Sequence, residues 1–288
     1  MHLGRLSARH RSSKKALPLM AAPPIYSTDM DQDERDRWDR IASSDPYFGV
    51  LVEPRFRGRQ LSGATRAAFF ATGMGHVDQV LRGFHRLTGD PRWDPDGPGP
   101  IGRILDIGCG VGRITLPLAR RATEAVGVDI SPLMLSEAAE NARLAGLSQS
   151  TFVRSDPELT QVTGQFDLIH SYITFQHIPP PDGCRLLASA LRRLAPNGVA
   201  MIHMTTRTGA PIGRMIRGLR RRFPALNTII HRLRGWPPSA PFIPMYPYHR
   251  PPLVALFDRE GIQILDEVHT DHGGHIGIMF FLRRYRAG

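Results

Sequence analysis

The sequence is poor in three features, and two of these shortages each exclude a class of protein. It has only two cysteines, Cys109 and Cys184, in 288 residues, so neither a disulfide framework nor a Cys/His zinc site of usual spacing can form. It has no uninterrupted apolar run of roughly 18 residues, the length that a membrane span requires. These shortages predict a soluble, cytoplasmic protein built around one large core with additions.

Lysine is also scarce, because Lys14 and Lys15 are the only two. The formal net charge of +11 is therefore carried almost entirely by arginine. Clustered cations favour contact with nucleic acids or anionic membranes. The strong preference for arginine over lysine, however, indicates a coding bias toward arginine. The position of the arginines is then more informative than their number, and they cluster between Arg214 and Arg234.

The residues before the core predict a tail and a helical extension. Residues 1–28 are expected to form a disordered basic tail, with Met20 or Met30 as an alternative start, because Pro18 and Pro23 interrupt the apolar stretch that a signal peptide would need. Residues 29–97 are expected to form a helical N-terminal extension, with helices over 29–42 and 75–87. The Pro/Gly-rich stretch over 90–100 predicts the boundary with a core of residues 98–288.

Short β-type runs alternate with helical patterns from Ile101 onward, which is typical of a parallel sheet covered by helices on both faces. Strands are predicted over 103–107, 125–129, 151–154, 166–172, 199–205, 263–268 and 275–283. Helices are predicted over 113–121, 132–146, 181–194 and 252–260, the second capped by Ser131.

The connection between the last two predicted strands is too short for a crossover between parallel strands, so they form an antiparallel hairpin. The predicted fold class is α/β, a Rossmann-like, doubly wound, seven-stranded sheet that is parallel except for its last strand. An insertion over 207–251 separates the fifth and sixth strands.

The stretch "ILDIGCGVGRIT" carries the strongest chemical signal, because Gly108, Gly110 and Gly112 follow an apolar run that ends on Asp106. A glycine loop between a strand and a helix lets backbone N–H groups approach a dinucleotide or an adenosine sulfonium cofactor. The dinucleotide pattern G-x-G-x-x-G requires a third glycine where Arg113 stands. The observed pattern, D-x-G-x-G-x-G, therefore favours the sulfonium class.

Five segments, in the expected order, resemble the motifs of the class I S-adenosylmethionine-dependent methyltransferases. They are "LDIGCGVGR" (105–113), "VGVDIS" (126–131), "FVRSD" (152–156), "FDLIHSYITFQHIP" (166–179) and "LRRLAPNGVAMI" (191–202). The resemblance covers roughly residues 100–206 and, more weakly, the C-terminal hairpin. It implies S-adenosyl-L-methionine as the cofactor and transfer of its methyl group to an acceptor.

The resemblance also implies a set of cofactor-binding residues. They are Asp106, Gly108, Cys109, Gly110, Gly112, Asp129, Ile130, Ser155, Asp156 and Ser171. Asp106 would lie near the methionine amino group, and Asp129 would accept hydrogen bonds from both ribose hydroxyls. Asp156 would take the adenine amino group, with Ile130 packed on the base. The alternatives are that Asp129 is an acidic residue at a helix start and that Asp156 begins a turn.

A hydroxyl or a protonated amine acceptor needs a base, so histidine is the catalytic residue type expected. His177 follows the fourth strand, at the sheet edge where ligands bind in open α/β sheets. The final hairpin turn lies at the same edge, which makes His272 and His275 further candidates. The alternatives are a packing or capping role for His177 and a merely polar turn for the hairpin. The spacing of the hairpin histidines is not diagnostic of a metal site, and no metal is predicted.

The insertion over 207–251 is predicted to be a lid over the acceptor, with an apolar face surrounded by arginines. Peripheral contact with an anionic membrane through this Arg-rich segment, or a solvated helix pair, are the alternatives. The aromatic residues among its prolines suit a sugar or an aromatic acceptor. They are Trp236, Phe242, Tyr246 and Tyr248.

The expected function is methyl transfer to a hydroxyl, or secondarily an amine, of a small molecule or saccharide. The stretches "DPYFGVL" (45–51) and "AFFATG" (68–73) resemble an N-terminal extension of bacterial methyltransferases near polysaccharide-related genes, which favours a saccharide. Nucleic-acid methylation is disfavoured, because residues 171–175 read "SYITF" rather than the Asn/Asp-Pro-Pro-aromatic sequence of amino-directed base methyltransferases. A catalytically inactive cofactor-binding module is the third hypothesis. The oligomeric state is not predicted.

Overall fold

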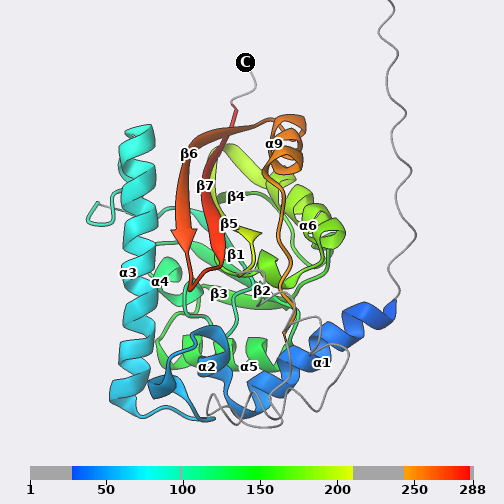
Figure 1. Ribbon diagram of the computed structural model, residues 1–288. Helices are drawn as coiled ribbons and strands as arrows, with labels where there is room; N and C mark the ends of the chain where they lie inside the picture. The colour runs from blue at the N-terminus through cyan, green and yellow to red at the C-terminus, as the bar shows by residue number, and fades with distance from the viewer. Residues whose placement is uncertain (1–27, 98, 210–242, 286–288) are drawn as a thin grey trace, which may run out of the picture.

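A computed structural model describes residues 28–97, 99–209 and 243–285 (Figure 1). The predicted basic tail and most of the predicted lid, including the arginine cluster and its apolar face, lie outside the described residues.

A seven-stranded sheet forms the centre of the molecule, with the strand order β3-β2-β1-β4-β5-β7-β6. Its strands are β1 (Arg103–Ile107), β2 (Glu124–Asp129), β3 (Ser150–Arg154), β4 (Phe166–Ser171), β5 (Leu194–Arg207), β6 (Ile262–Asp271) and β7 (Ile276–Arg284). Strands β1 to β5 pair in parallel, whereas β7 is antiparallel to both of its neighbours, β5 and β6. The predicted fold class, with an antiparallel last strand, is confirmed.

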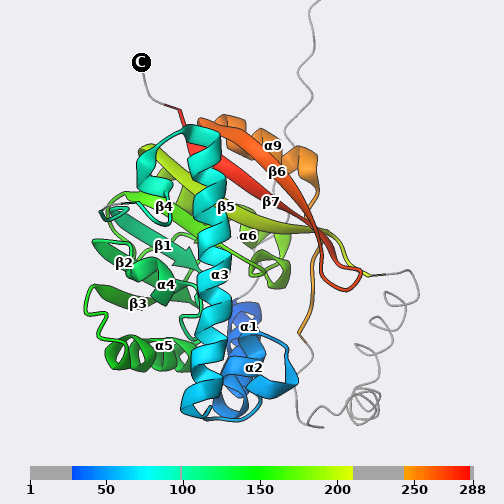
Figure 2. The same ribbon diagram turned by 90° about the vertical axis from the view of Figure 1, so that its left-hand side faces the viewer.

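Helices cover both faces of the sheet (Figures 1 and 2). One face carries α3 (Gly63–Thr88), α4 (Thr115–Ala119) and α5 (Pro132–Leu144), and the other carries α6 (Pro180–Arg192) and α9 (Arg250–Arg259). Neighbouring strand residues alternate between the two layers. Ile104 belongs to the core cluster that includes Leu81 of α3, whereas Leu105 belongs to the cluster that includes Leu187 of α6.

The first two helices, α1 (Thr28–Ser44) and α2 (Pro46–Val50), lie beside α5 at the lower end of the sheet in both views (Figures 1 and 2). They share a third apolar cluster with the glycine loop. Its buried members are Ala42, Tyr47, Phe56, Phe69, Val111 and Met134. Short 3-10 turns occur at η1 (Pro54–Phe56), η2 (Pro91–Trp93) and η3 (Phe175–His177). The N-terminal helices therefore pack directly on the candidate cofactor loop.

Several predicted element boundaries are wrong, and three of these differences have a clear local cause. Helix α3 begins at Gly63 rather than Gly75, because Ser62 caps it and Phe69 extends its buried face by further turns. Helix α4 is shorter than predicted, since the glycine loop continues to Ile114. Leu194 was expected in a helix but starts β5, where it pairs with Phe166.

The described helices include none that is both long enough and apolar enough to cross a membrane.

Candidate functional site

The glycine loop closes against the end of β2. The N–H groups of Gly108 and Cys109 both donate to the Val128 carbonyl, at 2.8 and 3.0 Å. Gly108, Gly110 and Gly112 have φ angles of +72°, +52° and +87°, a backbone region that costs glycine little and other residues more. The three glycines are therefore needed for the shape of the loop, whatever ligand it meets.

Asp129, at the end of β2, is tied to this loop by its carboxylate. Its Oδ2 accepts a hydrogen bond from the Gly110 N–H at 2.9 Å, and its Oδ1 accepts one from the Ser131 N–H at 3.0 Å. Burial raises the pKa of Asp129 to about 6, although the bonds from Ser131 and Gly110 oppose that rise. Each oxygen keeps a lone pair that can accept a further donor. The carboxylate can thus bind a pair of hydroxyl groups.

Contacts from the N-terminal extension hold the other side of the loop. A Cβ atom built on Gly110 would lie 2.6 Å from Val50 Cγ2 of α2. The Tyr47 hydroxyl donates to Glu137 at 2.7 Å and bonds Asn141 at 3.0 Å, and the Asn141 amide donates to the Val111 carbonyl at 2.9 Å. The sequence did not predict these contacts, which link α2, α5 and the glycine loop.

Asp156 forms a turn after β3. Its carboxylate accepts hydrogen bonds from the backbone N–H groups of Glu158, at 2.9 Å, and Thr160, at 3.1 Å, and from the Thr160 hydroxyl. This geometry supports the turn role that was the alternative for Asp156, and the adenine role stays a prediction. The neighbouring Ser155 N–H donates to the Asp129 carbonyl at 2.8 Å, and Ile130 is partly exposed beside it.

Asp106 lies on β1 and is only 2% exposed. Its Oδ2 accepts a hydrogen bond from the Thr115 hydroxyl at 2.6 Å, and its Oδ1 lies 2.8 Å from His170 Nδ1. Ser171, the other predicted residue of this region, is fully buried, and its hydroxyl donates to the Ile107 carbonyl at 3.0 Å. Both side chains are therefore bonded within the protein.

The structure brings together a cluster of rings around Tyr172, directly after β4. The Tyr172 ring lies 4.2 Å from that of His76, 5.2 Å from that of His203 and 5.9 Å from that of His272. The Tyr172 hydroxyl lies 3.3 Å from His272 Nε2, and His203 Nε2 lies 2.9 Å from the Thr270 hydroxyl. Burial lowers the pKa of His203 to about 4. This cluster combines residues of α3, β4, β5 and the last hairpin.

His177 lies at η3, half-buried, with both ring nitrogens in contact. Its Nδ1 lies 3.1 Å from the Pro244 carbonyl, so Nδ1 carries the proton, and its Nε2 lies 3.0 Å from the Gln176 amide nitrogen. Burial lowers the pKa of His177 to about 4. Trp38 of α1 packs edge-on against it, with ring centroids 5.4 Å apart. His177 is therefore a neutral imidazole beside an aromatic wall.

The two hairpin candidates lie with different partners. His272 is exposed and belongs to the Tyr172 cluster, whereas His275 lies close enough to His177 to lower its pKa electrostatically. Of the two hairpin candidates, His272 therefore lies by Tyr172 and His275 lies near His177. Within the described ranges, no group of three or more His, Cys, Asp or Glu side chains is arranged to hold a metal ion.

Sequence patterns did not single out His76, His170, His203 or Trp38 as site residues. His76 and His203 belong to none of the quoted motifs, and His170 lies within the fourth motif, over 166–179, but was given no role in it. The spacing of Val77, Val80 and Leu81 does indicate a buried face for their helix, and His76 directly precedes it. Its partner in β4 could not be recognised from that pattern.

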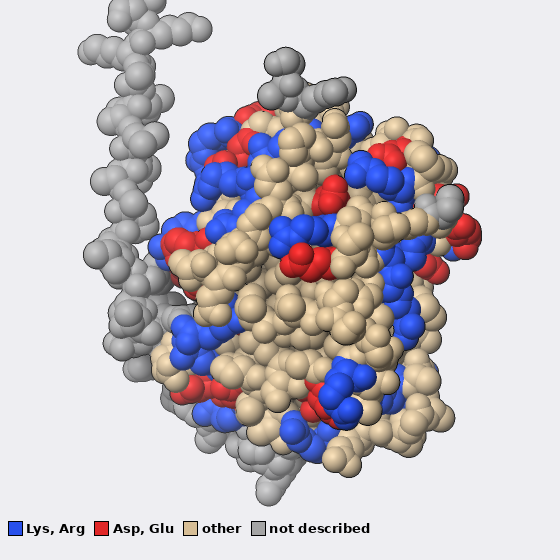
Figure 3. All heavy atoms as spheres, turned by 180° about the vertical axis from the view of Figure 1, so that it is seen from behind, with Lys and Arg blue, Asp and Glu red and all other residues tan. Residues whose placement is uncertain are grey.

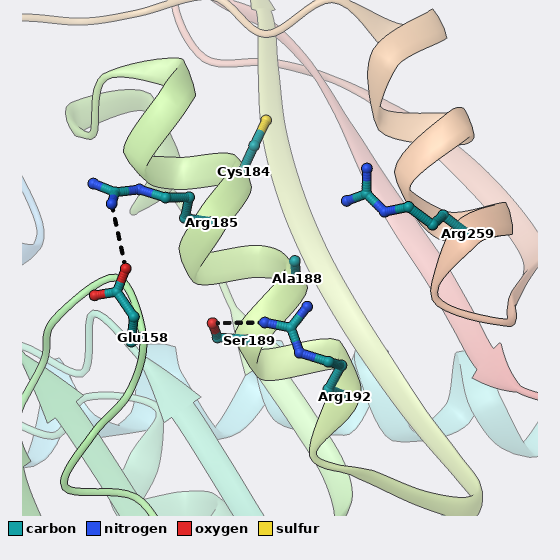
Figure 4. A pocket seen from close by; sticks show the side chains of 7 residues that line it. All are labelled: Glu158, Cys184, Arg185, Ala188, Ser189, Arg192 and Arg259. Carbon is teal, nitrogen blue, oxygen red and sulfur yellow. Dashed lines mark hydrogen bonds and ion pairs between the residues drawn. The ribbon is translucent and has the colours of Figure 1, made fainter. Parts of the chain in front are cut away.

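A groove of about 330 Å³ opens elsewhere, beside α6 and α9 (Figure 4). Its arginines have acidic partners: Arg185 lies 3.3 Å from Glu158, and Arg192 lies 3.3 Å from Glu260. Burial raises the pKa of the nearby Cys184 thiol, which disfavours its reactive thiolate form. None of the predicted site residues lines this groove.

Comparisons of the sequence with known proteins place the similarity in the core. Residues 104–198, about a third of the chain, match the family described as "Methyltransferase domain". The 23S rRNA (uracil(1939)-C(5))-methyltransferase RlmD of Klebsiella pneumoniae (strain 342) is 37% identical over 103 residues, which are 36% of this chain and 24% of that protein. Its namesake from Shewanella sp. (strain ANA-3) is 49% identical over 59 residues, 20% of this chain and 13% of that protein. The chain thus spans a quarter or less of the length of these curated relatives.

Two solved structures resemble most of the chain. The magnesium protoporphyrin IX methyltransferase (ChlM) from Synechocystis PCC 6803 with bound SAH has a TM-score of 0.58 at 19% identity, over 88% of this chain and 99% of that one. The N-methyltransferase NodS from Bradyrhizobium japonicum WM9, in complex with S-adenosyl-L-homocysteine, has a TM-score of 0.52 at 13% identity, over 87% of this chain and 98% of that one. At these identities the likeness establishes the fold.

Proposed function

We propose that this protein is a class I S-adenosylmethionine-dependent methyltransferase that methylates a hydroxyl group of a small molecule or saccharide. The match of residues 104–198 to a methyltransferase domain and the likeness of the fold to solved methyltransferases support this proposal. When bound, S-adenosylmethionine supplies a methyl group that its sulfonium has already activated. The residues of the chain then have to align the acceptor and exclude water, and such positioning can contribute roughly 7 to 11 kcal/mol.

The observation that carries the cofactor part is the carboxylate of Asp129. It stands at the carboxyl end of β2, the edge at which ligands bind in open α/β sheets. Its two oxygens each accept one backbone N–H, from Gly110 and Ser131, and each can accept a second donor. We propose that those donors are the two ribose hydroxyls, because a fixed carboxylate suits a bidentate diol.

The acceptor part rests on the surroundings of His177. Trp38 supplies an aromatic wall, Gln176 stands beside the imidazole, and the Tyr246 N–H donates to the Gln176 carbonyl at 2.7 Å. Sites for small ligands combine such apolar walls with a few fixed polar groups. We propose that the acceptor hydroxyl displaces the Gln176 amide from His177 Nε2, and that Nε2 then takes the acceptor proton, with His275 next to it. His272, on the Tyr172 cluster, is the second candidate.

The described residues carry charged side chains of both signs in similar numbers. Outside the described ranges lie 13 of the 37 Lys and Arg residues and none of the 26 Asp and Glu residues, so the described part holds 24 basic and 26 acidic side chains. On the face seen in Figure 3, basic and acidic side chains lie next to each other around a largely uncharged centre. A continuous basic surface, as phosphate polymers favour, is not what this face offers.

Methylation of RNA is the second candidate, and two observations favour it. The curated relatives described above are rRNA methyltransferases, and the basic residues without acidic counterparts are concentrated in residues 1–27 and 210–242. However, this chain matches only 24% and 13% of the length of those two relatives. Their substrate is therefore a weaker guide here than the methyltransferase chemistry itself.

Transfer of a radiolabelled methyl group separates these hypotheses. The full chain would be incubated with labelled S-adenosylmethionine and, in parallel, with oligosaccharides, small phenols and alcohols, and total RNA. We expect label in a hydroxyl-bearing small molecule or saccharide. Label in RNA would support the second candidate, and cofactor binding without transfer to any acceptor would support an inactive binding module.

Cofactor affinity should fall as the pH drops below about 6. Burial raises the pKa of Asp129 to about 6, so its carboxylate becomes protonated below that value. The proposed ribose hydroxyls bind the ionised form more strongly. Calorimetric titration with S-adenosylhomocysteine should give a constant Kd between pH 7 and 8, and a Kd that rises by up to about tenfold per unit at lower pH. Asp129→Asn, which does not titrate, should abolish this dependence; a wild-type Kd that is constant down to pH 5 would contradict the assignment.

Replacing His177 by alanine should lower the turnover rate about 100-fold and leave the Kd for S-adenosylhomocysteine unchanged. The reason is that its Nε2 is proposed to receive the acceptor proton, whereas the proposed cofactor contacts lie on β1 and β2. Turnover with the acceptor found above and calorimetry measure the two effects separately. His85→Ala, in the last turn of α3, serves as the control. Equal turnover in wild type and His177→Ala would exclude His177 as the base.

A further inference from the structure

A network of hydrogen bonds, buried except at His76, connects the N-terminal helix α3 to the strand that precedes the glycine loop. His76 Nε2 of α3 lies 3.0 Å from His170 Nε2 of β4, and His170 Nδ1 lies 2.8 Å from Asp106 Oδ1 of β1. The Thr115 hydroxyl completes the chain by donating to Asp106 Oδ2 at 2.6 Å. His170 is only 1% exposed. Figure 2 shows α3 lying along this face of the sheet.

This hydrogen-bond network lies between a helix and a sheet, where apolar side chains usually pack. Buried polar groups of this kind are often no better for stability than apolar residues of the same volume. Each member here is nevertheless bonded, including both nitrogens of His170 and both oxygens of Asp106. A fully bonded network holds its groups in one arrangement. His170 and Thr115 therefore determine the orientation of the Asp106 carboxylate. His76 contributes indirectly, because it holds the ring of His170.

This hydrogen-bond network brings no positive charge from α3 to the Asp106 carboxylate. Burial, together with the electrostatic influence of His170 and Arg113, lowers the pKa of His76 to about 2, so His76 is neutral. It can fix the ring of His170 without adding a charge. Each Asp106 oxygen has one bond and keeps a lone pair. A carboxylate held in this way, two residues before Gly108, suits a ligand ammonium group.

We infer that His170 and His76 are positioning residues that hold the Asp106 carboxylate for the ammonium group of the cofactor's methionine moiety. The inference rests on the proposed function. It adds that α3, which precedes the matched residues 104–198, is part of the cofactor site through His76.

The test compares two ligands that differ at that end. S-Adenosylhomocysteine carries the amino-acid group, and 5′-methylthioadenosine lacks it but keeps the adenosine and the sulfur. By calorimetry, His170→Leu should raise the Kd for S-adenosylhomocysteine about tenfold, and His76→Phe about threefold, as for weakened hydrogen bonds to a charged group. The Kd for 5′-methylthioadenosine should stay within a factor of about two in both variants.

Three further variants separate positioning from general loosening of the fold. His170→Asn, whose amide can donate to Asp106, should bind S-adenosylhomocysteine more tightly than His170→Leu. His85→Phe carries the same exchange on the same helix, where His85 Nδ1 lies 3.1 Å from the Asp90 carbonyl instead, and should bind both ligands as the wild type does. Adding His76→Phe to His170→Leu should not change the Kd for S-adenosylhomocysteine any further, because the hydrogen-bond network is already interrupted at His170.

Equal losses for both ligands, or an unchanged Kd for S-adenosylhomocysteine in His170→Leu and His76→Phe, would overturn the inference while leaving the proposed function intact. Wild-type protein that binds neither ligand would overturn the proposed function, and this inference with it. Melting temperatures of all variants identify any that fail to fold, and His76→Phe, at a partly exposed position, provides the comparison if His170→Leu is among them.

Discussion

Replacing Asp129 by alanine should raise the Kd for S-adenosylhomocysteine by more than about tenfold. The variant removes two proposed hydrogen bonds between ribose hydroxyls and an ionised carboxylate, and each bond of that kind contributes about 1.5 to 3 kcal/mol. It also releases the N–H groups of Gly110 and Ser131, which now donate to Asp129 at 2.9 and 3.0 Å. Calorimetric titration of the purified chain measures the effect directly.

A ligand comparison separates the loss of the ribose contacts from a disturbance of the loop. The wild type should bind the 2′-deoxy analogue of S-adenosylhomocysteine more weakly than the parent compound, and Asp129→Ala should bind the two equally. Glu140→Ala is the matched control, because Glu140 is an exposed acid on α5 whose partner is Arg143. An Asp129→Ala variant with the wild-type Kd would refute the ribose assignment.

Replacing Gly73 by alanine should lower the free energy of unfolding by about 3 kcal/mol. Gly73 is a buried residue of α3, and a Cβ atom built there would lie 2.0 Å from the Arg113 carbonyl oxygen. Both sides of that clash are backbone, so neither can turn away as a side chain could. Either the helix or the glycine loop at Arg113 would have to move.

Gly75→Ala, two residues further along the same helix, provides the opposite expectation. A Cβ atom on Gly75 would meet nothing within 4 Å, and alanine is better than glycine in a helix interior by roughly 0.5 to 1 kcal/mol. Urea denaturation should therefore show Gly73→Ala less stable and Gly75→Ala slightly more stable than the wild type. If both variants shift stability in the same direction, α3 does not approach the loop as closely as described.

Strong local patterns explain which parts of the fold were predictable. Ser131 was expected to cap α5, and its hydroxyl accepts the Met134 N–H at 3.2 Å, because a cap depends on residues three positions apart. The antiparallel direction of β7 followed from the few residues between β6 and β7. The same locality explains the error at Leu194, whose spacing fits α6 but whose backbone pairs with Phe166 across the sheet.

The candidate site divides in the same way. The glycine loop and Asp129 were recognisable, because a tight bend and a strand end are properties of adjacent residues. The turn bonds of Asp156 were foreseen as an alternative, since Asp-Pro often begins turns. The packing of Val50 on Gly110 and of Trp38 on His177 was not foreseen, because each joins segments that have no motif in common.

By itself the sequence determined the order of strands and helices, the loop without side chains and the acid that closes β2, because these depend on short-range sterics and on the period of apolar residues. Only the tertiary structure decided that His76 meets His170, 94 residues away, and that α1 and α2 cover the loop. Those contacts depend on which faces of distant elements pack together, and a lone histidine beside an apolar stripe carries no mark of its partner.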